Sequence, residues 1–203
     1  MAKIENIWNI PNFLTLLRII SALVAVYLIF SGYHIYYIAV AFVLGMVTDF
    51  FDGQIARRFN MKTEFGRQFD MIADRILIVG VALAIVIRFE ITGILSPTHF
   101  YQILFMLSRE IITTPIAIIT MALGAGFPQV RFIGKATTFL QSVTFPLIIL
   151  SIFYPIFNFS WYFAVLTGAL GLISGVYYLI DMTKLTIRRL REIKTAKAQI
   201  INQ

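Results

Sequence analysis

The chain has 203 residues, of which 59% are hydrophobic and only 13% are charged. This composition excludes an ordinary soluble protein and makes the lipid bilayer the natural solvent. The formal net charge is +7, but the basic residues lie between apolar blocks and near the end of the chain, which argues against a nucleic-acid partner. The absence of cysteine excludes disulfides, thiolate metal sites and cysteine nucleophiles.

The first predicted element is a short segment, residues 3–9, which cannot span a bilayer and is expected to lie at the membrane interface. Six apolar segments come after it, each close to the roughly 20 residues that a spanning helix needs. They lie near residues 12–31, 35–58, 66–89, 100–123, 134–153 and 159–181. The predicted fold is therefore an all-α integral membrane protein with six transmembrane helices.

The last predicted element, residues 184–203, is a basic tail in which lysines and arginines alternate with leucines and isoleucines. This pattern is typical of an amphipathic helix on an anionic membrane surface. We accordingly divide the chain into a membrane domain, residues 1–183, and a basic cytoplasmic tail, residues 184–203.

The charge of the connecting segments predicts how the chain crosses the membrane. The segment after the second span, the region around Arg131 and Lys135, and the tail are basic, whereas the opposite loops contain no lysine or arginine apart from Arg88 at their margin. The positive-inside rule places the basic segments and both termini in the cytoplasm. We expect a multi-pass protein of the cell membrane in contact with membrane lipids.

Two neighbouring spans carry four aspartates, although each intramembrane Asp costs roughly 2.5–3.5 kcal/mol on insertion scales. Asp49 and Asp52 are three residues apart, Asp70 and Asp74 are four apart, and each pair therefore shares a helix face. The short connection, residues 59–65, makes the two helices antiparallel neighbours. A rise of about 1.5 Å per residue then places all four carboxylates roughly 8–15 Å inside the cytoplasmic surface.

Four converging carboxylates in a medium of low dielectric constant require positive charge. Oxygen ligands without His or Cys suit Mg²⁺ or Mn²⁺, and four carboxylates are enough to hold two such ions. For any single aspartate the alternative is an ion pair with Arg57, Arg67 or Arg75. Gly53, Ala56 and Gly66 lack bulk where a ligand or a second helix approaches, and Thr63 is placed to cap the third span.

Residues 49–74 read DFFDGQIARRFNMKTEFGRQFDMIAD and contain the pattern DxxDGxxARx8GxxxDxxxD at every specified position. This pattern resembles the signature of the CDP-alcohol phosphatidyltransferases. The resemblance implies six transmembrane helices, a homodimer, and transfer of a phosphatidyl group from CDP-diacylglycerol to an alcohol. It also implies that Asp49 and Asp70 contact both metal ions, that Asp52 completes the first site, and that Asp74 binds the second ion and acts as the general base.

The same resemblance assigns a group of residues to the CDP moiety. The opening IPNFLTLLRI resembles that of the phosphatidylglycerophosphate and cardiolipin synthase branches, which places Asn12 and Thr15 beside the nucleotide. The complete set of expected CDP-lipid contacts is Asn12, Thr15, Gly53, Ala56, Arg57, Thr63 and Gly66.

The acceptor alcohol is less well specified, because the signature describes the donor. If the acceptor is glycerol 3-phosphate, its phosphate needs cations, and Arg109, Arg131 and Lys135 are the candidates. The alternative for Arg109 is an internal pair with Glu110 or with an aspartate. The phosphatidylglycerophosphate branch usually has Pro and Lys where this chain has Met71 and Arg75, so phosphatidylglycerol, inositol phosphate and serine stay open as acceptors.

Two readings outside this enzyme class also stay open. A cation transporter would use intramembrane acids as an ion path, but its acids should be spread across the membrane, whereas these cluster in one half. A structural membrane protein with a relict site is the third hypothesis.

Overall fold

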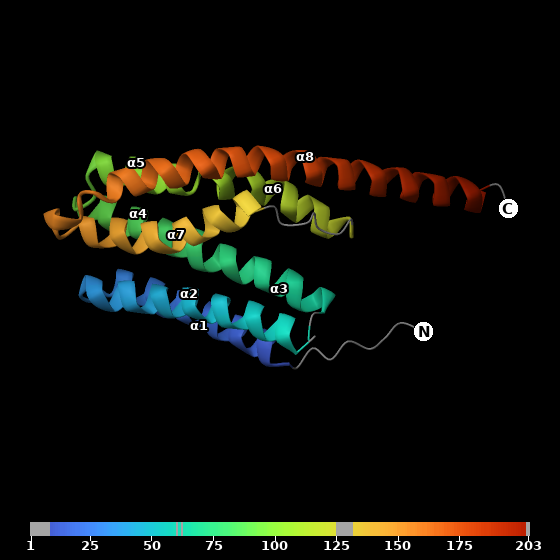
Figure 1. Ribbon diagram of the computed structural model, residues 1–203. Coiled ribbons are helices and arrows are strands. Elements are labelled where there is room, and N and C mark those ends of the chain that lie inside the picture. Colours follow the sequence, from blue (N-terminus) through green and yellow to red (C-terminus); the bar gives the residue numbers. More distant parts are fainter. Residues whose placement is uncertain (1–8, 60, 62, 125–131, 202–203) are drawn as a thin grey trace. The chain divides into compact units, whose positions relative to one another are not determined.

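The computed structural model describes residues 9–59, 61, 63–124 and 132–201, and every regular element in this part of the chain is helical (Figure 1). The elements are α1 (Ile10–Phe30), α2 (Ile35–Arg58), α3 (Glu64–Arg75), the π-helix η1 (Ile76–Gly80), α4 (Val81–Ile91), α5 (Pro97–Met106), α6 (Ser108–Ala122), α7 (Phe132–Ser151), the 3₁₀-helix η2 (Pro155–Phe157) and α8 (Ser160–Ile201). The all-α prediction is confirmed for the described residues.

These helices form two compact units, which are described separately. The first unit comprises Met1–Ile103 and Phe145–Ser160, and the second comprises Leu104–Thr144 and Trp161–Gln203. The four aspartates belong to the first unit.

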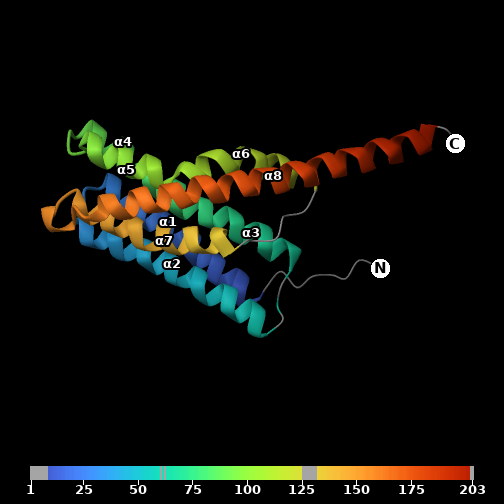
Figure 2. The same cartoon turned by 45° about the horizontal axis from the view of Figure 1, so that its top comes forward.

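Helices α1 and α2 run antiparallel and side by side in the first unit, and both views show this (Figures 1 and 2). Their connection is short, and Gly32 within it has a φ of 73°, a conformation that favours glycine. Ala22 and Ala25 of α1 are completely or almost completely buried, so that small side chains lie at the packed face. Small residues let membrane helices approach closely, where packing and polar contacts hold them together.

The first unit also contains a continuous helical stretch, α3–η1–α4. Gly45 of α2 faces η1: a Cβ atom at Gly45 would lie 2.9 Å from both methyl carbons of Leu77. Asp49 lies one turn after Gly45 and Asp74 lies just before η1. The missing side chain at position 45 therefore lets α2 and η1 come together next to the two aspartates.

The second unit is held together by small and polar residues. A Cβ atom at Gly168 of α8 would lie 2.8 Å from the backbone oxygen of Phe105, so the two backbones are nearly in contact. The hydroxyls of Thr144 and Thr167 are 2.8 Å apart, and both side chains are fully buried. Such hydrogen bonds and close approaches are typical of membrane helix packing.

Four helical segments of the described residues are long and apolar enough to cross a membrane: Ile10–Phe30, Ile35–Ala56, Phe132–Ser151 and Pro155–Thr195. Helices α5 and α6 form a bent pair that makes a fifth if it counts as one span. Large apolar side chains are exposed along these helices, for example Tyr162 at 76% and Leu23 at 60%. The chain is thus a multi-pass membrane protein, because such surface is stable against lipid and not against water.

The predicted count of six spans is not confirmed by this finding. The third predicted span, residues 66–89, falls on α3, η1 and α4, which have 12, 5 and 11 residues and are each too short to cross alone. The predicted tail is helical as far as Ile201 and continues α8 without a break. Most of the predicted interfacial segment, residues 3–9, lies outside the described residues.

Candidate active site

The four aspartates come from two antiparallel helices of the first unit. Asp49 and Asp52 lie in the last three turns of α2, and Asp70 and Asp74 lie in the last two turns of α3. Thr63 caps the start of α3 as predicted: its side chain accepts a hydrogen bond of 2.9 Å from the backbone N–H of Gly66. The cap fixes where the helix starts and therefore which face carries its two carboxylates.

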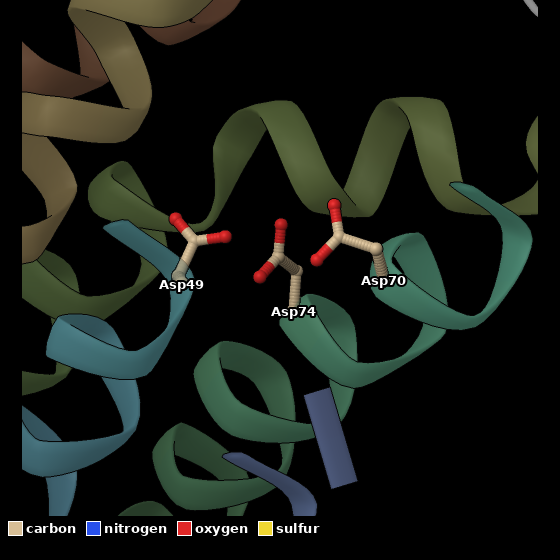
Figure 3. A group of neighbouring side chains, drawn as sticks. All are labelled: Asp49, Asp70 and Asp74. Atoms are coloured by element: carbon tan, nitrogen blue, oxygen red, sulfur yellow. The ribbon is translucent and has the colours of Figure 1, made fainter. Parts of the chain in front are cut away.

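The side chains of Asp49, Asp70 and Asp74 lie next to one another, as Figure 3 shows. One carboxylate oxygen from each lies within 4.8 Å of the others, close enough to hold a common metal ion. The donors are all carboxylate oxygens, which suit hard divalent ions such as Mg²⁺ and Mn²⁺. The residues present therefore fit the predicted kind of metal centre. Asp52 lies outside this group of three but joins it through Arg18.

Arg18 of α1 forms ion pairs with all four aspartates. One terminal nitrogen, Nη1, lies 2.6 Å from Asp70 and 2.6 Å from Asp74. The other, Nη2, lies 2.9 Å from Asp49 and also pairs with Asp52. The Arg18 side chain is completely buried. The predicted alternative of an arginine partner thus has a counterpart in the structure, in which Arg18 pairs with all four aspartates.

The sequence prediction missed Arg18, although a signal was present. It is the only charged residue in the apolar segment 12–31. A charged side chain within a membrane span is a functional candidate by default, and a partner should be sought for it. The sequence does not identify the partners of Arg18, because the carboxylates lie far from it along the chain.

A cavity of about 430 Å³ opens beside the aspartates. Its wall includes two of them, Asp52 and Asp70. It also includes six of the seven predicted CDP-lipid contacts: Asn12, Thr15, Gly53, Ala56, Thr63 and Gly66. Of the described residues, Pro11, Met61 and Arg67 also line the wall, and Arg67 adds a cation that the sequence prediction had not assigned to this ligand.

Several contacts shape this wall. The hydroxyl of Thr15 lies 3.3 Å from Asp52, and both residues are buried. A Cβ atom at Gly66 would lie 2.6 Å from the side-chain oxygen of Asn12 and 2.9 Å from the Thr63 hydroxyl. Glycine at position 66 is therefore what allows Asn12 to reach the start of α3.

The remaining predicted site residues are Arg57, Arg109, Arg131 and Lys135. The side chain of Arg57 and the whole of Arg131 lie outside the described part of the chain. Arg109 and Lys135 belong to the second unit, where Arg109 donates a hydrogen bond of 3.0 Å to Thr138 and Lys135 is exposed. Glu110, the predicted alternative partner of Arg109, accepts a hydrogen bond of 2.7 Å from Gln141.

Comparison with known proteins identifies the class to which this site belongs. The family model described as CDP-alcohol phosphatidyltransferase matches residues 8–176. A protein of Rickettsia typhi named CDP-diacylglycerol–glycerol-3-phosphate 3-phosphatidyltransferase is 33% identical over 144 residues, which cover 70% of this chain and 76% of that protein. A protein of Wigglesworthia glossinidia brevipalpis with the same name is 32% identical and covers 87% of this chain and 92% of its own length.

A third relative carries a different name. The cardiolipin synthase (CMP-forming) of Streptomyces coelicolor is 30% identical over 195 residues, which cover 89% of this chain and 86% of that protein. The chain therefore belongs to the CDP-alcohol phosphatidyltransferase family. The predicted enzyme class, a CDP-diacylglycerol-dependent phosphatidyltransferase of phospholipid biosynthesis, is confirmed.

Proposed function

We propose that the chain transfers a phosphatidyl group from CDP-diacylglycerol to glycerol 3-phosphate, with release of CMP. The observation that carries the proposal is the shared wall of the 430 Å³ cavity, in which residues of the CDP-alcohol signature stand beside Asp52 and Asp70. A donor held in this cavity would have its pyrophosphate next to the carboxylate cluster. The names of the relatives from Rickettsia typhi and Wigglesworthia glossinidia brevipalpis support glycerol 3-phosphate as the acceptor.

In the proposed mechanism Asp49, Asp52, Asp70 and Asp74 hold two divalent ions, Mg²⁺ or Mn²⁺. Bound there, the ions would neutralise the pyrophosphate and stabilise the leaving CMP. Asn12, Thr15, Gly53, Ala56, Arg57, Thr63 and Gly66 hold the CDP moiety.

Asp74 takes the proton from the acceptor hydroxyl in this mechanism. The acceptor oxygen forms a new bond to the phosphorus of the phosphatidyl group, and the bond from that phosphorus to the oxygen of CMP breaks. The family resemblance gives this role to the fourth aspartate of the signature, which is Asp74, and its side chain is 36% exposed.

The acceptor phosphate would be bound by Arg109, Arg131 and Lys135, which are cations suited to a phosphate group. A second candidate function is cardiolipin synthesis with phosphatidylglycerol as the acceptor, which the name of the Streptomyces coelicolor relative favours. Phosphatidylglycerol carries a phosphodiester with a single negative charge, whereas the phosphomonoester of glycerol 3-phosphate carries up to two and should need these cations more. The two functions therefore differ in their dependence on these three residues.

We also propose the arrangement of the protein in the cell membrane. Residues Glu64–Ile91 form one further span built from α3, η1 and α4, which gives six spans in total. Both termini and the carboxylates face the cytoplasm, where the excess of basic residues lies. Residues 1–183 act as the membrane domain and residues 184–203 as a basic tail, and the protein is a homodimer.

The function is tested with purified protein, CDP-diacylglycerol, Mg²⁺ and a panel of alcohols, with CMP release as the measurement. We expect release with glycerol 3-phosphate, loss of activity with EDTA, and recovery on addition of Mg²⁺ or Mn²⁺. Release with phosphatidylglycerol alone would move the assignment to cardiolipin synthesis. No release with any acceptor from folded protein would contradict the enzyme class.

The proposed base is tested by Asp74→Asn, which keeps the shape of the side chain and removes the proton acceptor. We expect CMP release to fall by about 10²–10⁴-fold, the range for a lost general base, and further if ion binding is also weakened. Glu90→Gln, a carboxylate-to-amide change at an exposed position of α4 outside the proposed site, is the control and should keep the wild-type rate. Equal rates for Asp74→Asn and wild type would remove Asp74 from the mechanism.

A further inference from the structure

Arg18 approaches the carboxylates from the interior of the first unit. Its side chain has no exposed surface, whereas those of Asp49, Asp70 and Asp74 are 28%, 41% and 36% exposed. The carboxylates therefore lie between the guanidinium and the open side of the site. A cation that arrives from the open side therefore meets the carboxylates before it meets Arg18.

The guanidinium is also divided between the two helices. Nη1 contacts the two aspartates of α3, and Nη2 contacts the two aspartates of α2. The planar guanidinium holds its two terminal nitrogens at a fixed separation. Its third nitrogen, Nε, is buried and has no hydrogen-bond partner in the part of the chain that the structure describes. The polar contacts of Arg18 there are thus all made to the carboxylates, and they fix one carboxylate pair relative to the other.

The charge balance shows when this contact is needed most. Four ionised carboxylates carry four negative charges, and Arg18 supplies one positive charge. Removing one partner of a buried ion pair is strongly destabilising, because the remaining charge is left uncompensated. Divalent ions on the open side would add positive charge to the same carboxylates, so the site depends on Arg18 most before they bind.

We propose that Arg18 is a positioning residue that holds the two carboxylate pairs together in the metal-free protein, so that divalent ions enter a preformed site. This inference rests on the proposed function, which supplies the ions. Arg18 touches neither the donor nor the acceptor in this scheme. It acts through the four aspartates.

The test measures thermal unfolding of the full-length protein in detergent, after EDTA and again with saturating Mn²⁺. Arg18→Met removes the charge and the fork, and Arg18→Lys keeps the charge but offers a single nitrogen. Without metal we expect Arg18→Met to lower Tm by roughly 6–20 °C and Arg18→Lys to lower it less. Arg88→Met, the same change at a half-buried arginine of α4, is the matched control and should shift Tm by only a few degrees.

Mn²⁺ separates this role from ordinary packing. The ions supply part of the missing positive charge, so we expect Mn²⁺ to raise the Tm of Arg18→Met more than that of wild type and to reduce the difference between them by at least half. If the Tm difference between wild type and Arg18→Met is unchanged or larger in Mn²⁺, the proposal is overturned. Arg18 would then stabilise helix packing or the metal-bound site, not the metal-free carboxylates.

A second arm needs no metal. Asp52 is the most buried of the four carboxylates, and loss of Arg18 leaves its charge uncompensated. In EDTA we expect the double variant Arg18→Met/Asp52→Asn to unfold at a higher temperature than Arg18→Met alone. If Arg18→Met does not fold, the comparison is made with Arg18→Lys and Arg18→Lys/Asp52→Asn. If Asp52→Asn changes the Tm by the same amount in the wild type and in the Arg18 variant, the two residues are not coupled and the proposal is wrong.

The two arms also distinguish this inference from the proposed function. If Mn²⁺ and Mg²⁺ leave the Tm of the wild type unchanged, the proposed metal site fails, while the EDTA arm still decides whether Arg18 holds the carboxylates.

Discussion

A side chain at position 66 would collide with two residues of the cavity wall. The nearest atoms, the Asn12 side-chain oxygen and the Thr63 hydroxyl, belong to a residue of α1 and to the cap of α3. Asn12 would have to withdraw, because the Thr63 hydroxyl is held by its capping hydrogen bond to the Gly66 N–H. A methyl group at position 66 would therefore change the shape of the proposed CDP site before it changed the fold.

We predict that Gly66→Ala raises the KM for CDP-diacylglycerol several-fold. Gly80→Ala is the matched control, because a Cβ atom there meets nothing within 4 Å, and alanine replaces glycine in a helix with a gain of about 0.5–1 kcal/mol. The measurement is the initial rate of CMP release against donor concentration. An unchanged KM for CDP-diacylglycerol in Gly66→Ala would show that this part of the cavity wall does not bind the donor.

Individual residues differed in how far the sequence could predict them. Asp49, Asp70 and Asp74 were predicted to converge because helix periodicity and a short connection suffice to bring them together. Arg18 was not, because its partners are recognised only once α1 is placed against α2 and α3. Arg67 was missed as a cavity residue for a similar reason: its charge marks it as a cation, but its position relative to α1 cannot be derived from periodicity.

At the scale of single elements, η1 shows what hydropathy does not reveal. The apolar pattern of residues 66–89 predicts one straight helix, whereas the structure inserts a π-helix at Ile76–Gly80 directly after Arg75. Such insertions are frequent at functional sites, and they rotate the helix after the insertion relative to the helix before it. Residues 70 and 74 therefore share one face of α3, and the faces of α4 are rotated relative to that face by the intervening π-helix.

The close approach of α8 to Phe105 gives a prediction about stability. A methyl group at Gly168 would lie 2.8 Å from a backbone oxygen, which cannot turn away as a side chain can. We expect Gly168→Ala to destabilise the second unit by about 1–3 kcal/mol, the usual cost of overpacking. Thermal unfolding in detergent measures the effect.

Gly175→Ala is the control for this prediction, because its Cβ atom would meet Arg109 and Thr113 at 3.8 and 3.9 Å, which are ordinary contact distances. It should be neutral or slightly stabilising. Equal Tm values for Gly168→Ala and Gly175→Ala would contradict the close approach of the α8 backbone at Gly168 to the backbone of Phe105.

At the scale of the whole molecule, the membrane crossings were predicted from composition and the internal division was not. Ile10–Phe30 and Phe132–Ser151 can be found from the sequence, because a helix that crosses the lipid needs about 20 apolar residues. The split into two units arises from which helix faces pack together. That packing depends on small residues such as Gly45 and Gly168, whose partners a hydropathy profile does not identify.

The proposed third span can be tested because the chain has no cysteine of its own. We predict that Phe59→Cys and Thr98→Cys, both at exposed positions, react with a membrane-impermeant maleimide from opposite sides of sealed vesicles. Unsubstituted protein should give no labelling. Labelling of both from the same side would show that Glu64–Ile91 does not cross.

The placement of Arg18 also has a consequence for biosynthesis. Translation delivers α1 before α2 and α3, so the guanidinium reaches the bilayer before any of its four partners has been synthesised. A lone arginine near the middle of a span costs roughly 2.5–3.5 kcal/mol on insertion scales. The leucine, isoleucine, valine and phenylalanine residues of α1 offset this cost, because each contributes about −0.3 to −0.6 kcal/mol on the same scales, so we expect α1 to enter the lipid alone and its ion pairs to form when α2 and α3 arrive.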